Sequence, residues 1–200
     1  MKLKRLFSLI VTLSLCLCAF SLQAFADAPL NLPATMNAYL EDDMGNVEVA
    51  TGHLVNTPVA YSNSDDISAT YAFNLYRAGE NITVYGEDSA YASTVYLTIH
   101  LSTTNQYQGT TLYRLDSVEG YWRDSDPDTR VTDANLVYGC SAIFPSVQTQ
   151  RGSRSVNNNF YVSTGFDGYG EAYLGAIGAT LTLDYQMGSR TWSFSLQNNL

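Results

Sequence analysis

Three aspartates at alternate positions are the first side chains in this sequence whose types and spacing suit a chemical role. Asp124, Asp126 and Asp128 fall in a short polar stretch that also contains Pro127. Carboxylates spaced in this way on a loop can converge on a hard cation such as calcium. The stretch does not match a helix-loop-helix calcium site, because Thr129 stands where that loop needs a glycine. We expect a solvated acidic turn, with calcium as the one candidate cofactor.

Aromatic side chains near expected turns form the second group. Rigid rings beside Asn, Gln and Asp make good platforms for sugar rings or peptide chains. The candidates for exposed rings are Tyr107, Tyr121, Trp122, Tyr169 and Tyr173. For each of them, ordinary core packing or a cross-strand aromatic pair is the competing interpretation. Trp192, in the last expected strand, is predicted to be buried. The group predicts a surface for a carbohydrate or for another protein.

Paired acids are what an enzymatic interpretation would require. Jelly-roll glycosidases place two carboxylates opposite each other in a groove, one as nucleophile or base and one as acid. The acidic residues in or near expected strands are Glu48, Asp116, Glu119, Glu171 and Asp184. The sequence does not decide whether any two of them face each other. A small secreted glycoside hydrolase is therefore an alternative, and no catalytic residue is assigned.

Histidine, cysteine and arginine carry weaker signals. His53 and His100 are too far apart to form a zinc motif, and no paired-cysteine spacing occurs. Cys140 lies in an apolar stretch and is expected to be a buried small hydrophobe. Arg151 and Arg154 fall in a glycine- and serine-containing stretch, which predicts a solvated hairpin tip. Anion binding is the competing interpretation of these two arginines.

Alternation of apolar and polar residues defines the elements that must position these side chains. It is clearest over 67–77 and 93–102. Further strands are expected at 46–51, 81–85, 110–122, 129–139, 141–149, 156–164, 178–186 and 191–197. About nine or ten short strands separated by turns predict an all-β fold, specifically an antiparallel β-sandwich or jelly-roll-like single domain.

The N-terminus has the organisation of an export signal. Three basic residues are followed by an apolar segment over 6–22, and Ala24 and Ala26 supply the small-x-small pattern of a signal peptidase site. We expect residues 1–26 to be a cleavable signal peptide, 27–36 an extended lead-in, and 37–200 a single all-β domain. The expected localisation is secreted and extracellular, or periplasmic where the source has an outer membrane.

Removal of this leader would change the charge of the chain. All nineteen acidic residues would remain, but only seven of the ten basic ones, so the formal charge would move from −9 to −12. Such a surface is repelled by phosphate backbones and anionic lipids. We therefore expect no nucleic-acid partner and no stable membrane insertion after cleavage. Cys140 would be the remaining cysteine, so no internal disulfide is expected.

Together these features predict a secreted, non-enzymatic β-sandwich protein. It would bind a carbohydrate, a peptide or a cell-surface partner through exposed aromatic rings. The jelly-roll glycoside hydrolase is the alternative. An eight-stranded outer-membrane barrel is a further alternative, which the alternation of Trp192, Phe194 and Leu196 permits. Leu200 argues against that barrel, because such chains usually end on an aromatic residue.

Overall fold

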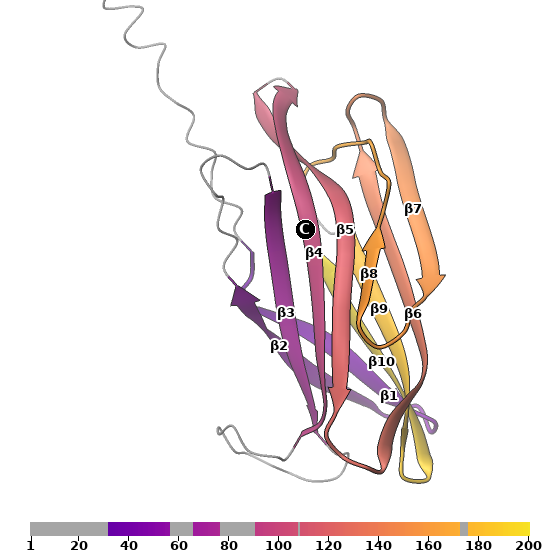
Figure 1. Cartoon of the computed structure of the whole chain (residues 1–200). Helices are drawn as coiled ribbons and strands as arrows, with labels where there is room; N and C mark the ends of the chain where they lie inside the picture. The colour runs from indigo at the N-terminus through magenta and orange to yellow at the C-terminus, as the bar shows by residue number, and fades with distance from the viewer. Residues whose placement is uncertain (1–31, 57–65, 77–90, 108, 173–175) are drawn as a thin grey trace, which may run out of the picture. The chain divides into compact units, whose positions relative to one another are not determined.

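A computed structural model describes residues 32–200 of the chain, apart from 57–65, 77–90, 108 and 173–175. The regular structure of the described residues is entirely β (Figure 1). The strands are β1 (Thr35–Asp42), β2 (Val47–Asn56), β3 (Asp66–Tyr76), β4 (Tyr91–Tyr107), β5 (Thr110–Asp124), β6 (Thr129–Ala142), β7 (Gln148–Ser155), β8 (Phe160–Ser163), β9 (Ile177–Met187) and β10 (Arg190–Asn199).

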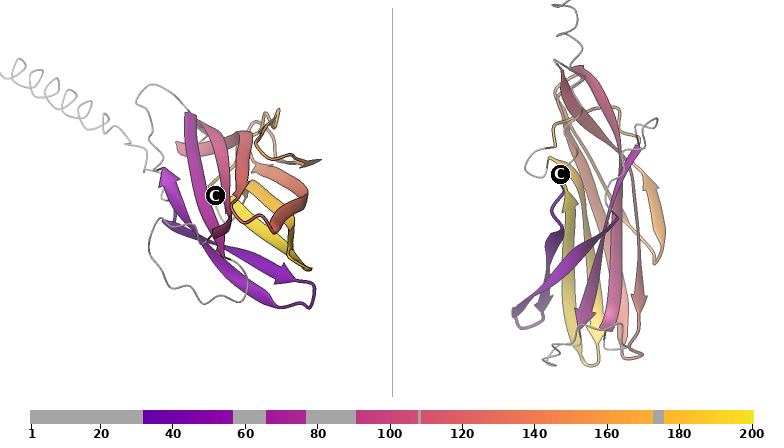
Figure 2. Two further views of the ribbon diagram at one scale, coloured as in Figure 1. Left: turned by 60° about the horizontal axis from the view of Figure 1, so that its bottom comes forward. Right: turned by 90° about the vertical axis from the view of Figure 1, so that its left-hand side faces the viewer.

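These strands form a single antiparallel sheet in the order β7-β6-β9-β10-β1-β2-β3-β4-β5-β8. The sheet curls into a half-barrel, as Figure 2 shows along two further directions. The prediction of an all-β antiparallel fold is therefore confirmed. The finer prediction of a sandwich or jelly roll is not confirmed, because a sandwich packs two sheets and all ten of these strands are hydrogen-bonded into one.

Strand alternation produces the core directly. Tyr71 and Phe73 of β3 and Leu97 and Ile99 of β4 are all fully buried on the concave side of the curled sheet. The residues between them point to the opposite side, which we call the outer face. Phe73 also contacts Phe194 of β10 edge-to-face, with ring centroids 5.9 Å apart. Burial of these side chains in one continuous core is what curls the sheet around them.

The segment 164–170 joins the two halves of the curled sheet. Gly170 exchanges two backbone hydrogen bonds of 2.8 Å with Tyr113 of β5. Next to it, Tyr169 donates a 2.7 Å hydrogen bond to the carbonyl of Phe144, which follows β6. The segment therefore connects β5 to the end of β6 across the opening between the two edge strands, β8 and β7.

The arginine stretch is placed differently from the sequence-based expectation. We expected a hairpin tip at 150–154, but these residues lie inside β7, and the turn falls between β6 and β7 instead. The strand β7 pairs with β6 alone and is an edge of the sheet. An edge strand contacts solvent widely and needs little apolar alternation, and charged side chains suit it. Its polar sequence therefore resembles that of a loop.

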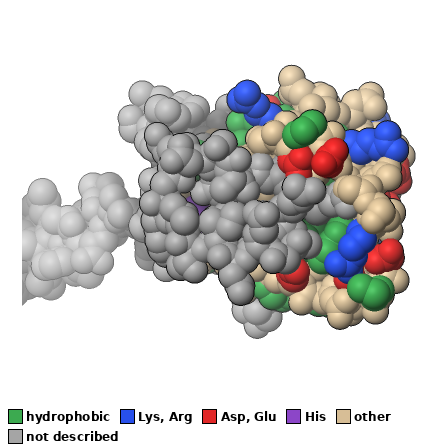
Figure 3. Space-filling view, turned by 90° about the horizontal axis from the view of Figure 1, so that it is seen from below, with side chains coloured by type: hydrophobic (Ala, Val, Ile, Leu, Met, Phe, Trp, Pro, Cys, Tyr) green, Lys and Arg blue, Asp and Glu red, His purple; other side chains and the backbone are tan. Residues whose placement is uncertain are grey.

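A polar end of the sheet holds the β1–β2, β5–β6 and β9–β10 turns. Viewed from this end, the described surface mixes acidic, basic and scattered apolar side chains (Figure 3). Asp42 is buried there and accepts backbone hydrogen bonds from Met44 at 3.0 Å and Asn46 at 2.7 Å. Its carboxylate also forms an ion pair with Arg190. This pair fastens the β1–β2 turn to the start of β10.

Two of the predicted elements lie outside the described residues. These are the strand over 81–85 and the signal peptide over 1–26, with Ala24 and Ala26. The predicted lead-in over 27–36 is described only from residue 32, and β1 begins at Thr35.

Candidate functional site

Three tyrosines lie on the outer face of neighbouring strands. Tyr96 of β4 and Tyr121 of β5 are directly opposite each other in the antiparallel register, and their rings stack at 4.3 Å and 15°. Tyr161 lies on the adjacent strand β8. It is 66% exposed, and Tyr121 is 45% exposed. We call this surface, with His100 and Glu119 between the rings, the tyrosine face.

Residues on the inner side of the sheet hold the tyrosine face in place. The edge strand β8 is four residues long, and its alternate residues Phe160 and Val162 are buried. Gly120 of β5 is opposite Phe160, and a Cβ added at Gly120 would lie 2.8 Å from the Phe160 ring. The missing side chain therefore makes room for the ring that anchors β8. That anchor directs Tyr161 outward, because successive strand side chains point to opposite faces.

Polar groups lie among the exposed rings. His100 Nε2 is 3.2 Å from Glu119 Oε1, and the His100 ring is 6.5 Å from that of Tyr161. Partial burial, together with a hydrogen bond to Tyr96, raises the pKa of the Tyr121 hydroxyl. The tyrosine face combines apolar rings with donors and acceptors, the combination found in small-molecule sites.

Tyr107 and Tyr169 lie together at the other end of the β4–β5 hairpin. Both rings contact Phe144, with centroid separations of 6.2 Å and 6.5 Å. Arg114 lies over the Tyr169 ring at 5.0 Å and forms a 2.6 Å ion pair with Asp116. These contacts tie the 164–170 segment to the sheet. The sequence-predicted rings are therefore divided between two places, and Tyr173 lies outside the described residues.

The predicted exposure of Trp122 is wrong. Its side chain is 6% exposed and faces the core. Trp122 follows Tyr121 directly, so alternation sends the two rings to opposite faces of β5. The predicted burial of Trp192 is confirmed, at 4% exposure.

The three aspartates of the calcium candidate lie at and beyond the end of β5. Asp126 accepts the backbone N–H of Asp128 at 2.9 Å, which closes a tight turn. Partial desolvation raises the pKa of Asp124, although a hydrogen bond from Ser93 opposes the shift. Over the described part of the chain, no three or more Asp, Glu, His or Cys side chains form a group suited to a metal ion. Calcium binding stays a prediction.

The acids of the hydrolase alternative are spread over several strands. Asp116 and Glu119 each have a basic side chain within 3.2 Å. Asp184 of β9 is opposite Asp133 of β6 in the register, and both side chains are exposed. The two other acids are also exposed; they are Glu48 and Glu171.

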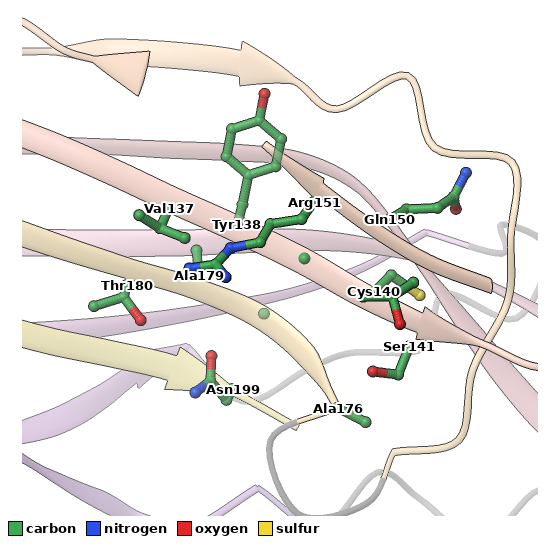
Figure 4. A pocket seen from close by; sticks show the side chains of 13 residues that line it. Val137, Tyr138, Cys140, Ser141, Gln150, Arg151, Ala176, Ala179, Thr180 and Asn199 are labelled. Atoms are coloured by element: carbon green, nitrogen blue, oxygen red, sulfur yellow. The ribbon is translucent and has the colours of Figure 1, made fainter. Parts of the chain in front are cut away.

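A pocket of about 230 Å³ lies beside the edge strand β7 (Figure 4). Gly139 of β6 is directly opposite Gly178 of β9. The absence of a side chain at Gly139 leaves a hollow on the outer face, whereas the space beside Gly178 is taken by Asn198 and Asn199. We call the hollow the glycine trough. Figure 4 shows the Arg151 side chain extending from β7 across β6 toward Thr180 of β9. The side chains around the hollow are Val137, Ser141, Thr149, Arg151, Thr180 and Asn199.

Cys140 lies next to this trough with its side chain on the inner side of the sheet. It is 1% exposed, and burial raises the pKa of its thiol. The thiol donates to the carbonyl of Gly168 at 3.5 Å. The expected buried, hydrophobic cysteine is confirmed, and its raised pKa makes it a poor nucleophile.

Sequence reasoning missed two parts of these surfaces. Tyr96 and Tyr161 lie within expected strands, whereas the ring candidates from the sequence are those near expected turns. Their outward alternation relative to buried neighbours was the available signal. The trough depends on the pairing of Gly139 with Gly178, 39 residues later, which single-sequence patterns do not reveal.

Comparison with known proteins gives no indication of function, so a functional proposal depends on the fold and on these surfaces. No protein-family model matches this chain, and no curated protein or solved structure is significantly similar to it. None of the described residues forms a helix long and apolar enough to cross a membrane.

Proposed function

We propose that this chain is an exported, non-enzymatic β protein that binds carbohydrate through its tyrosine face. The observation that carries the proposal is the outward placement of Tyr96, Tyr121 and Tyr161 on three neighbouring strands. The C–H faces of a sugar ring pack well against rigid aromatic rings, which lose little conformational entropy on binding.

The polar neighbours of these rings support a saccharide ligand. Glu119 is directly opposite Tyr161 and lies 3.2 Å from His100, so a carboxylate and an imidazole lie among the rings. Sugar hydroxyls need both acceptors and donors as partners. A purely apolar partner would desolvate these polar groups without offering them new hydrogen bonds, which is unfavourable.

Retention on insoluble polysaccharides tests the proposal. Residues 27–200 would be incubated with a panel of plant, fungal and bacterial cell-wall polysaccharides, and the bound fraction measured after sedimentation. We expect the wild type to be retained on at least one of them, and Tyr121→Ala and Tyr161→Ala to lose at least nine-tenths of that retention. Tyr39→Ala is the matched control, because Tyr39 is a 55% exposed tyrosine on a different strand, β1.

The proposal fails if the wild type is retained on none of the panel, or if Tyr39→Ala and Tyr161→Ala reduce retention equally. Release of soluble sugar from a retained polysaccharide would instead favour a glycoside hydrolase.

The export of the chain is tested separately. The full chain, expressed with a secretory apparatus, should reach the medium or the periplasm with Asp27 as its first residue. Retention of residues 1–26 would contradict this part of the proposal.

A further inference from the structure

The glycine trough has an ordered arrangement across four neighbouring strands. Arg151 of β7, Gly139 of β6, Gly178 of β9 and Asn199 of β10 are consecutive partners in the register. The row has the backbone of Arg151 at one end, two residues without side chains in the middle, and Asn199 at the other end, and the Arg151 side chain extends from its end over the row toward Thr180. Three strand spacings separate the ends, or about 14 Å.

Gly139 and Gly178, which form the floor of the trough, differ in what requires a glycine at each position. Gly178 has φ of +154°, and an added Cβ would lie 2.3 Å from the carbonyl oxygen of Asn198. The backbone therefore requires glycine at this position. At Gly139 an added Cβ would meet only the carbonyl oxygen of Gln150, at 3.2 Å. Packing alone excludes a side chain there much less strongly, and its absence keeps the trough open to solvent.

Arg151 is the cation of the trough. Among the residues that the structure describes, it has neither an ion-pair nor a hydrogen-bond partner, whereas Arg114 and Arg190 are each held by an aspartate. None of the side chains that line the trough is acidic. The guanidinium is therefore available to a ligand, and repulsion from more distant acids is largely screened beyond about 8–10 Å in physiological salt.

We propose that the glycine trough binds a sugar acid, with its carboxylate on Arg151 and its ring over Gly139 and Gly178. A guanidinium presents two parallel N–H groups that match a carboxylate. The other polar side chains are neutral donors and acceptors suited to ring hydroxyls: Ser141, Thr149, Thr180 and Asn199. This inference rests on the carbohydrate binding proposed above and adds a second, acid-selective subsite on a different part of the sheet.

The charge and the size of the trough limit the kinds of ligand that fit it. One guanidinium balances one negative charge, which favours a monoanionic carboxylate over a phosphate dianion. The volume of about 230 Å³ is below the usual range for drug-sized ligands, so the trough suits a single ring rather than a chain of them.

Titration of residues 27–200 with D-glucuronate, followed by amide chemical shifts in NMR, tests this subsite. We expect saturable shifts confined to the strands of the trough, and at least tenfold weaker binding in Arg151→Gln. Arg154→Gln is the matched control, because Arg154 lies three residues along the same strand but points to the opposite face. Gly139→Val is a second variant, which should fill the trough and also weaken binding at least tenfold.

Three further probes distinguish the sources of the negative charge. D-Glucose, inorganic phosphate and an N-acetylated dipeptide with a free C-terminus would be titrated in the same way. Binding that follows the proposal is at least tenfold stronger for glucuronate than for any of the three. Equal or tighter binding of the dipeptide or of phosphate would overturn the proposal, as would equal loss in Arg151→Gln and Arg154→Gln, or no saturable shift with glucuronate.

The two proposals can fail separately. Tyr161→Ala should abolish retention on polysaccharide while leaving glucuronate binding within twofold of the wild type. If retention fails but glucuronate binds in an Arg151-dependent way, the trough is a site and the tyrosine face is not. If retention depends on Tyr161 but glucuronate does not bind, the inference about the trough is wrong and the proposed function stands.

Discussion

The tyrosine face and the glycine trough are two ways of building a surface on the outside of one curled sheet. In the tyrosine face, rings stand out from the strands, and Gly120 makes space for Phe160 on the inner side. In the trough, the missing side chain of Gly139 leaves the space on the outer side, and Gly178 accommodates the close approach of Asn198 and Asn199. The same residue type therefore supports a protrusion in one region and a hollow in the other. Which face of the strand the missing side chain would have occupied decides the outcome.

The largest loss of stability is expected on substitution of Gly178, the glycine that the backbone of the trough requires. Gly178→Ala should lower the free energy of unfolding by about 3 kcal/mol or more, because the new Cβ meets backbone and the residue has a positive φ. Urea unfolding followed by circular dichroism measures the change. Gly139→Ala is the control from the same trough, and it should lose about 1 kcal/mol or less. Equal losses at the two positions would show that the fold alone requires both glycines.

A smaller loss is expected at Gly120, beneath the tyrosine face. Gly120→Ala should lower the free energy of unfolding by about 2 kcal/mol, because its Cβ would lie 2.7 Å from the Tyr96 carbonyl oxygen and 2.8 Å from the Phe160 ring. The measurement is again urea unfolding.

A second substitution identifies the cause of the loss at Gly120. The double variant Gly120→Ala with Phe160→Leu should couple favourably relative to the sum of the two single changes. Strict additivity would mean that the two residues do not share the space beneath β8.

A still smaller change in the free energy of unfolding is expected from the stacked rings of Tyr96 and Tyr121. A double-mutant cycle with Tyr96→Ala and Tyr121→Ala should give a coupling energy of about 0.5–1.5 kcal/mol in the free energy of unfolding. Loss of binding in the same variants should be far larger than this change in stability. If binding falls only in proportion to stability, the rings stabilise the sheet and do not recognise a ligand.

Much of the fold followed from local pattern, and the exceptions have physical causes. The strands β3, β4, β9 and β10 alternate clearly because one of their faces is buried in the core. The strand β7 was missed because an edge strand with polar side chains lacks that alternation. The single curled sheet was not distinguished from a sandwich, because strand order depends on pairings such as β1 with β10 that join distant parts of the chain.

The candidate sites were less predictable than the fold. Tyr121 was identified correctly as exposed, yet its neighbour Trp122 was assigned the same exposure although alternation separates them. The stacking of Tyr96 on Tyr121 and the row from Arg151 to Asn199 depend on register. A one-residue slip in register would send every side chain of a strand to the other face, so such sites cannot be found from composition.

The smallest expected change in stability concerns Asp124, which lies at the end of β5 beyond the tyrosine face. Cys140, beside the trough, is the titrating group with which it is compared. Desolvation raises the pKa of Asp124, so the folded chain holds this proton more tightly than the unfolded chain does. Stability is therefore lost as pH rises from the ordinary value of 3.8 through the raised one. Because Asp124 is also exposed to solvent, which weakens the effect, Asp124→Asn should raise Tm at pH 7 by about 1 °C or less, and the difference should shrink below pH 4.

Calcium changes the expected sign of this effect, because a bound cation stabilises the ionised carboxylate and the folded chain with it. If Asp124, Asp126 and Asp128 bind calcium, millimolar calcium should raise the Tm of the wild type, and Asp124→Asn should abolish the rise. Cys140→Ala is the control from the trough region, and its Tm response to calcium should equal that of the wild type. A Tm that calcium and a chelator both leave unchanged would reduce this stretch to the solvated turn closed by Asp126. A fall in Tm for Asp124→Asn without calcium would mean that the hydrogen bond from Ser93 outweighs the desolvation of the carboxylate.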